Sequence, residues 1–271
     1  MRREDLGRAA RPTARTRKGA QVTQDLVQSL PRLYLTAPSP CPYLAGRLER
    51  KMFTQLAKAD ANALNSLLTQ SGFRRSQNIA YRPACEGCSA CISVRIVARE
   101  FEFRRGFART LKRNADIERK AVMARATEEQ FALLRGYLDS RHDDGGMADM
   151  ALFDYRAMVE LTDVDCQLVE YRLRDGSPRG RLVGVSLTDT LEDGQSMVYS
   201  FYDTELEARS LGTFMVLDHV REAHRLGFPH VYLGYWVRGS RKMAYKSRFR
   251  PMEALTARGW EPIEKVDPRA R

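Results

Sequence analysis

Residues 199–220 read YSFYDTELEARSLGTFMVLDHV, and this stretch decides the predicted fold. A strand is predicted over residues 196–203, where aromatic residues are concentrated. An amphipathic helix is predicted over residues 210–227, because apolar residues recur at helical spacing and a glycine can end the helix. Gly212 lies at the start of this helix, where unpaired backbone N–H groups are available to a bound group.

Strand patterns flank this stretch on both sides. Residues 166–173 and 180–191 precede it as strand candidates, separated by the turn signals RDGSPRG and EDG. After the helix, residues 229–237 read as another strand and residues 240–250 as a short helix, and a final strand segment closes the chain. An antiparallel meander followed by alternating helices and strands is typical of an α/β fold.

The order of strand, glycine-containing loop and helix resembles the coenzyme A site of GNAT-type acetyltransferases, which hold the pyrophosphate at this helix N-terminus. That loop usually carries small residues, so that its backbone can contact phosphate. Here Phe214 stands where a second glycine or alanine would be expected. We therefore expect an α/β, GNAT-like fold with a mixed, mostly antiparallel sheet and flanking helices, in which the coenzyme site is blocked.

The first half of the chain is predicted to add an N-terminal α/β part. Strands over residues 78–85 and 91–98 are expected to flank a cysteine-rich turn at one end of a hairpin. A basic helix is expected over residues 104–122. A further helix is expected to start at Thr127, which forms a capping box with Gln130.

These patterns divide the chain into three predicted parts. Residues 1–22 form a basic, disordered tail with seven Arg and Lys against Glu4 and Asp5. Residues 23–125 form an N-terminal transferase domain that contains the cysteine turn, and residues 126–271 form the C-terminal GNAT-like transferase domain.

Composition narrows the class of protein. The 271 residues are 43% hydrophobic, which is enough for a substantial core. There is no apolar run long enough to span a bilayer and no apolar segment of a secretory signal, so we expect no membrane partner. Five cysteines without an export signal favour a reducing, cytoplasmic location. The net charge of +11 suits a polyanionic partner such as nucleic acid.

The sequence CEGCSAC, residues 85–91, places Cys85, Cys88 and Cys91 at three-residue spacing. A closed zinc or iron–sulfur site normally has four protein ligands, and Cys41 in the proline-rich loop is the candidate for the fourth. A reversible dithiol or disulfide is the alternative, and inert thiols are the third interpretation.

Two stretches are rich in cations. WVRGSRKMAYKSRFRP, residues 236–251, contains six cations and no acid, with aromatic residues interleaved. Like charges four residues apart on a helix repel each other, so a bound anion would relieve the repulsion. The second basic run lies within the predicted basic helix and consists of Arg104, Arg105, Arg109, Lys112 and Arg113.

Five motifs in a fixed order resemble one family. SPCPYL, GFRRSQNIAYRPAC, YSFYD, SLGTF and KMAYKSRFRP occur in the same order in the aminoacyl-tRNA–protein transferases of the N-end rule. The short length and the cysteine turn resemble the bacterial branch, which moves leucine from leucyl-tRNA to proteins that begin with Asp or Glu. The resemblance leaves open arginyl-tRNA as the donor. A GNAT-type N-acetyltransferase and a non-catalytic RNA-binding module are alternatives of other classes.

The resemblance also implies how the residues would be used. An aminoacyl ester is already activated, so no catalytic nucleophile is expected and the catalytic residues stay unassigned. Lys242, Lys246 and Arg74 are the candidates to bind the acidic side chain, and Tyr199, Tyr202 and Tyr245 to position the amine or the terminal adenosine. The acceptor stem would lie along residues 104–113 or along Arg248 and Arg250. No cofactor is required for transfer, while an iron–sulfur cluster or zinc at the cysteine turn is left open.

Overall fold

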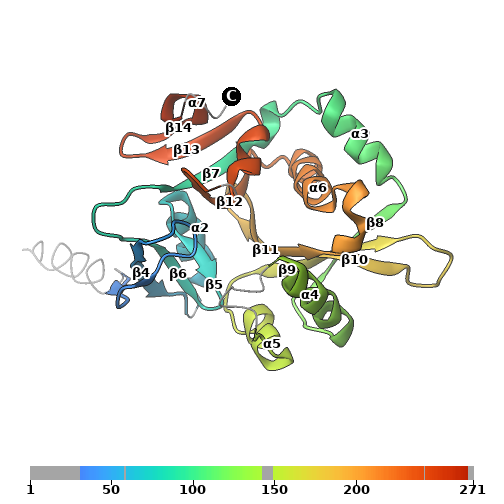
Figure 1. Ribbon diagram of the computed structural model, residues 1–271, viewed down its shortest axis with the longest axis horizontal. Coiled ribbons are helices and arrows are strands. Elements are labelled where there is room, and N and C mark those ends of the chain that lie inside the picture. Colours follow the sequence, from blue (N-terminus) through green and yellow to red (C-terminus); the bar gives the residue numbers. More distant parts are fainter. Residues whose placement is uncertain (1–30, 58, 142–148, 241, 268–271) are drawn as a thin grey trace, which may run out of the picture. The chain divides into compact units, whose positions relative to one another are not determined.

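An eight-stranded sheet forms the centre of the fold, in the order β14-β13-β7-β12-β11-β10-β9-β8 (Figure 1). All neighbouring strands are antiparallel except β11 and β12, which are parallel. The strands are β7 (Cys91–Val97), β8 (Ile117–Met123), β9 (Cys166–Leu173), β10 (Arg181–Leu191), β11 (Gly194–Tyr202), β12 (His230–Val237), β13 (Met252–Thr256) and β14 (Gly259–Pro262). The predicted α/β fold with a mixed, mostly antiparallel sheet and flanking helices is confirmed.

This computed structural model describes residues 31–57, 59–141, 149–240 and 242–267. Residues from Leu33 onward form one unit. The basic tail predicted over residues 1–22 lies outside the described residues. Within the described ranges, there is no helix with the length and apolar character that crossing a membrane requires.

Helices cover both faces of the large sheet (Figure 1). On one face, α6 (Leu211–Leu226) packs with α3 (Arg105–Arg113) and the short helices η1 (Ala98–Glu100) and η2 (Thr204–Arg209). On the other face, α4 (Glu128–Arg141) and α5 (Leu152–Glu160) pack against β10 and β11. Because both faces are covered, β10 is buried along nearly its whole length.

A smaller sheet precedes the large one, in the order β1-β4-β6-β5. Its strands are β1 (Tyr34–Leu35), β4 (Lys51–Gln55), β5 (Arg74–Ser76) and β6 (Ile79–Pro83), and β2 (Ser39–Pro40) pairs separately with β3 (Leu48–Glu49). Helix α2 (Ala61–Gln70) packs on this sheet. The remaining elements are η3 (Ala244–Arg248) and α7 (Ile263–Val266).

A buried ion pair joins the small sheet to the large one. Arg75 of β5 donates two hydrogen bonds to Asp189 of β10, at 2.8 and 2.6 Å. Asn65 of α2 donates a third hydrogen bond to the same carboxylate, at 3.1 Å. Because both charges are removed from water, each depends on the other for its stability.

Two sequence expectations are wrong. The basic helix predicted over residues 104–122 ends at Arg113, and β8 begins four residues later at Ile117, because Asn114 turns the chain by donating hydrogen bonds to the carbonyl oxygens of Thr110 and Arg209. The cysteine turn does not close a hairpin, since β6 belongs to the small sheet and β7 to the large one. The turn therefore links the two sheets.

Other local expectations are confirmed. Thr127 and Gln130 form the predicted capping box. The Thr127 backbone N–H donates to Gln130 Oε1 at 3.0 Å, and the Gln130 backbone N–H donates to Thr127 Oγ1 at 3.2 Å. The helix predicted over residues 210–227 is α6, and Gly227 ends it in a left-handed conformation.

Strands β7 and β8, which come from the first half of the chain, belong to the large sheet.

Candidate active site

The candidate site lies where two parallel strands separate. β11 and β12 pair only from Gly194 to Ser196 and from His230 to Tyr232. Beyond this point β11 continues along β10, and β12 continues along β7. Backbone carbonyl groups on the two facing edges therefore need partners other than the neighbouring strand.

Two cationic side chains supply these partners. The Arg74 guanidinium donates a hydrogen bond to the carbonyl oxygen of Val198 on β11. Lys246 Nζ donates to the carbonyl oxygens of Leu233 and Tyr235 on β12, at 2.8 and 2.7 Å. The small sheet and η3 thus each send one cation into the gap between the separated strands.

Gly234 allows Arg74 to reach this position. It has φ = +69°, and a Cβ built there would lie 2.9 Å from Arg74 Nε and 3.0 Å from Cζ. A side chain at position 234 would therefore displace the guanidinium as well as strain the backbone.

The two cations differ in their availability to a ligand. Burial lowers the pKa of Lys246 well below its usual range, and the charge of Arg74 lowers it further. The Lys246 amine is hydrogen-bonded to two backbone carbonyl groups, so its role is to support the structure around the gap. Among the described residues, Arg74 donates a hydrogen bond to Val198 only, and the groups that act on its charge are tyrosines, with no Asp or Glu among them. Its remaining N–H groups are suited to bind a carboxylate.

Tyrosines lie close to Arg74 on several sides. Tyr81 lies on β6, Tyr235 on β12 and Tyr199 on β11. Tyr43 lies in the loop between β2 and β3, and Tyr245 lies in η3. Burial raises the pKa of Tyr199 to about 12, and its hydroxyl has no hydrogen-bond partner within the described part of the chain. A buried hydroxyl without a partner costs stability, which is typical of a group that meets a substrate.

An aromatic ring covers the start of α6, but it is the ring of Tyr202 and not that of Phe214, as the sequence had suggested. Phe214 is buried and packs on Tyr171, at 5.7 Å between ring centroids. The ring that meets the helix start belongs to Tyr202: a Cβ at Gly212 would lie 2.9 Å from it. Tyr202 also packs edge-on against Tyr137 of α4, at 5.2 Å. Gly212 is thus required for close aromatic packing.

The predicted tRNA-binding cations fall into two groups. On α3, Arg104, Arg105, Arg109 and Lys112 are exposed and form no ion pair with any described residue, whereas Arg113 donates to the carbonyl oxygen of Ala208. Near η3, Arg248 donates to the Thr213 hydroxyl and Arg250 pairs with Glu264 at 2.8 Å. Lys242 is exposed in the turn before η3.

A stack of rings connects α3 with η3. Phe107 of α3 stacks on Phe249, with centroids 5.5 Å apart and planes 5° from parallel. Phe249 in turn contacts Tyr245 edge-on at 6.4 Å. The basic helix and the candidate site are therefore joined through rigid aromatic contacts.

Comparisons with known proteins agree with this arrangement. Residues 39–109 match the family described as "Arginine-tRNA-protein transferase, N terminus", and residues 129–256 match its C terminus. A protein of Rhizobium leguminosarum bv. trifolii (strain WSM2304), named "Aspartate/glutamate leucyltransferase", is 58% identical over 240 residues, covering 86% of this chain and 93% of its own.

This chain belongs to the aspartate/glutamate leucyltransferase family.

Solved structures resemble this leucyltransferase-family chain at low sequence identity. FemX aligns with a TM-score of 0.39 and 10% identity, over 78% of this chain and 81% of its own. A GCN5-related glucosamine N-acetyltransferase region of a fungal multi-domain GH3 beta-N-acetylglucosaminidase aligns with a TM-score of 0.38 and 12% identity, over 76% of this chain and 22% of its own.

Four of the five cysteines of this family member line one small cavity. Cys41, Cys85, Cys88 and Cys91 all line a cavity of ≈ 60 Å³, together with Tyr43, Tyr81 and Tyr235. Cys41, the candidate for a fourth ligand, thus lies at the same cavity as the other three. All four are free thiols. Burial, and to a smaller extent the neighbouring cysteines, raise the pKa of Cys91 to about 12.

The four thiols do not form a metal site. In the described ranges, no three His, Cys, Asp or Glu side chains are arranged to hold a metal ion. Cys85 is instead bonded to the backbone of Arg50, whose N–H lies 3.4 Å from Sγ. The expected zinc or iron–sulfur cluster does not fit the residues as they are placed.

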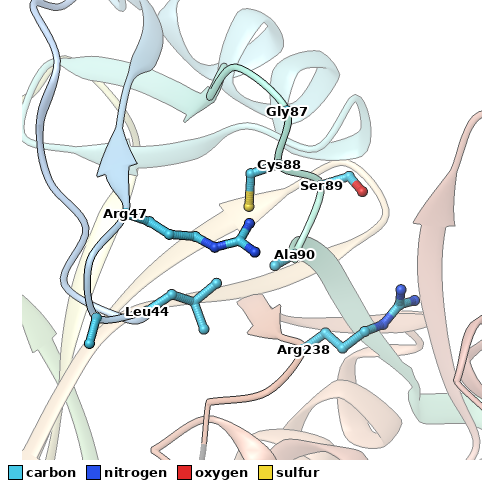
Figure 2. A pocket seen from close by; sticks show the side chains of 8 residues that line it. Leu44, Arg47, Gly87, Cys88, Ser89, Ala90 and Arg238 are labelled. Atoms are coloured by element: carbon cyan, nitrogen blue, oxygen red, sulfur yellow. The ribbon is translucent and has the colours of Figure 1, made fainter.

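A larger cavity lies beside the cysteine turn (Figure 2). Its volume is ≈ 470 Å³, and its wall is shared by the early loop, the cysteine turn and the end of β12. Figure 2 shows the Arg47 side chain extending toward Cys88 and Ala90. Arg238, on the same wall, donates to the carbonyl oxygen of Val266 at 3.0 Å.

Proposed function

We propose that this protein transfers leucine from leucyl-tRNA to the α-amine of proteins that begin with Asp or Glu. Such a transfer would mark these proteins for degradation by the N-end rule, and it would take place in the cytoplasm, where aminoacyl-tRNA is found. The observation that carries the proposal is Arg74, a cation in the gap between β11 and β12 without a carboxylate partner among the described residues. The names of the relatives support the same donor and acceptor.

The acidic side chain of the acceptor would bind to Arg74. A guanidinium can bind a carboxylate through two parallel hydrogen bonds, which fixes its direction as well as its position. Lys246 supports the gap through backbone carbonyl groups, and Lys242 is exposed in the turn that leads into η3.

The reaction needs alignment more than chemical activation. The α-amine nitrogen attacks the ester carbonyl carbon, the C–N bond forms, and the bond from that carbon to the ribose oxygen breaks. The amine proton moves to the leaving ribose oxygen, so atoms and charges balance. The usual pKa of an α-amine is about 7.7–8.0, so a useful fraction is neutral. Holding amine and ester in contact supplies a large part of the rate enhancement.

The donor side is supported by aromatic surface. Tyr137, Tyr202 and Tyr245 lie near one another at the end of β11. Such rings offer flat apolar surface to a leucyl side chain and a stacking partner to the terminal adenosine. An arginyl donor would instead need a carboxylate beside its side chain. We take leucine as the donor because the relatives are named as leucyltransferases.

The acceptor stem would lie along α3. Its exposed cations have no protein counter-charge in the described residues, so they remain available to phosphates. The ring stack from Phe107 to Tyr245 leads from this helix to the gap.

A transfer assay tests the proposal. Purified protein is given radiolabelled leucyl-tRNA or arginyl-tRNA and model proteins that begin with Asp, Glu, Lys or Ala. We expect leucine to appear on Asp and Glu proteins only, and arginine transfer would overturn the donor assignment. The Arg74→Gln variant should lose roughly 10²-fold in activity or more, because a buried charge-assisted pair is worth about 2–5 kcal/mol. The control is Arg82→Gln, an exposed arginine of the neighbouring strand, which should retain activity.

A further inference from the structure

A chain of buried hydroxyl groups runs beneath β11 and is not used by the proposed reaction. Ser200 Oγ lies 3.0 Å from Ser186 Oγ, which lies 3.2 Å from Thr188 Oγ1. Thr188 Oγ1 lies 2.9 Å from Nε2 of His219 on α6. His219, Ser186 and Thr188 are fully buried, whereas Ser200 is half-buried. The chain thus leads from the core to Ser200, a residue that is partly exposed.

The histidine fixes the direction of the first hydrogen bond. His219 Nδ1 lies 2.8 Å from the carbonyl oxygen of Met215, which can only accept, so Nδ1 carries the proton. Tyr171 also contacts Nδ1, at 3.2 Å, but its own proton is donated to Asp218 at 3.1 Å. Burial lowers the pKa of His219 to about 4, so the ring is neutral at pH 7 and Nε2 is an acceptor.

Each hydroxyl has one proton, so the remaining directions follow. Thr188 must donate to His219 Nε2, because no other proton reaches that nitrogen. The Thr188 oxygen therefore accepts from Ser186, and the Ser186 oxygen accepts from Ser200. The proton of Ser200 is therefore donated to Ser186, and any further hydrogen bond of the Ser200 oxygen can only be accepted.

The position of Ser200 relates this acceptor to the candidate site. It lies on β11 beyond the last pairing with β12, between Tyr199 and Tyr202, and two residues after Val198, whose carbonyl binds Arg74. Val198 is the bulged residue of β11, since Leu187 pairs with Tyr199 and Thr188 with Met197. Cα atoms two residues apart lie at most about 7 Å from each other. This closeness along the strand suits the carboxylate and the α-amine of one N-terminal acidic residue, each with its own hydrogen bond.

We propose that Ser200 Oγ accepts a hydrogen bond from the α-amine of the acceptor protein and orients that amine for attack. The inference rests on the proposed function and names a residue for its acceptor side. The ester carbonyl and the acidic side chain carry only acceptors at pH 7, so neither can satisfy this oxygen. A ribose hydroxyl of the terminal adenosine is the other donor of similar chemistry. Ser186, Thr188 and His219 are positioning residues, which act by holding the Ser200 proton toward Ser186.

Two-substrate kinetics test the proposal. For Ser200→Ala we expect kcat/KM for an Asp-starting protein to fall about tenfold, the loss from one hydrogen bond, with the dissociation constant for leucyl-tRNA unchanged. Ser200→Thr, which keeps the hydroxyl, should recover part of the activity. Ser196→Ala, a half-buried serine of the same strand with no side-chain hydrogen bond to a described residue, is the matched control.

The outcomes are distinct. Ser200→Ala within twofold of wild type would overturn the proposal, and a loss confined to leucyl-tRNA binding would assign the contact to ribose instead. Absence of leucine transfer by wild type would refute the proposed function itself. The hydrogen-bond direction is checked independently by ¹⁵N NMR of His219: a proton on Nε2 at pH 7 would contradict it, whatever the activity.

Discussion

Replacing His219 should change how stability depends on pH. His219 is enclosed by Met215, Thr188 and Tyr171, and the nearest charged groups that affect it are Arg119 and Glu222. Burial is the largest cause of its lowered pKa, which falls from the usual 6.5 to about 4. The folded protein therefore holds this histidine neutral at pH values where the unfolded chain would protonate it.

The sign and size follow from the two pKa values. Below pH 6.5 the unfolded chain binds a proton that the folded protein does not, so stability is full above this pH and is lost as the pH falls. With a folded pKa of about 4, the loss between pH 8 and pH 5 is about 2 kcal/mol from this residue alone. Most carboxylates titrate below this interval.

Denaturant unfolding at pH 8, 7, 6 and 5 measures the effect. His219→Gln keeps an acceptor for Thr188 and removes the titrating ring, so its stability should change about 2 kcal/mol less than that of wild type over this range. The comparison concerns the slope of stability against pH, so a constant difference in stability between the two proteins does not affect it. Parallel curves would refute the reasoning. If the variant does not fold, NMR titration of His219 decides: a midpoint near 6.5 in the native protein would contradict the lowered pKa.

Three further results are expected. Asp189→Asn should lower the free energy of unfolding by about 3–5 kcal/mol in urea titrations, because Arg75 would keep a buried charge without its partner; a loss below about 1 kcal/mol would speak against the pair's role. Arg109→Gln with Lys112→Gln should reduce the slope of log affinity for tRNA against log salt by about 1.5, and an unchanged slope would remove α3 from the interface. Cys91, with its pKa raised to about 12, should react with iodoacetamide at pH 8 on the order of a hundredfold more slowly than a peptide thiol, as followed by mass spectrometry.

The second half of the fold could be read from the sequence because its elements carry local signals. Turn glycines and alternating apolar residues marked β9, β10 and β11, and helical spacing with Gly227 marked α6. The helix–strand change at Asn114 carried no such signal. Its cause is a pair of hydrogen bonds from the Asn114 amide, one of them to Arg209, which is far away in sequence.

The sequence grouped candidate residues that lie near one another in the fold, and their membership of the active site stays a prediction. The residues Arg74, Tyr199, Tyr202, Tyr245 and Lys246 do come together. The role proposed for each residue depends on where β11 and β12 separate. This separation is a long-range property of the sheet, which local sequence patterns do not encode. The same holds for Ser200, whose hydroxyl gains significance only from partners on β10 and α6.

The cysteine turn shows a different limit. Spacing alone suggested a ligand set, and the four thiols do converge on one cavity. Ligation additionally requires matching directions of the ligand atoms, and in the described residues no three candidate side chains are arranged in this way, while Cys85 Sγ accepts a hydrogen bond from the backbone N–H of Arg50. Proximity in the fold is therefore insufficient evidence for a metal centre.

The separated edges of β11 and β12 have a kinetic consequence. Because their carbonyl groups are already bonded to Arg74 and Lys246, the gap keeps its width in the substrate-free protein. The ordering of the site is completed during folding and need not be repeated in each catalytic cycle. Neither substrate then has to open the sheet for the other. We therefore expect random-order binding of the two substrates, with association rates governed by diffusion and charge.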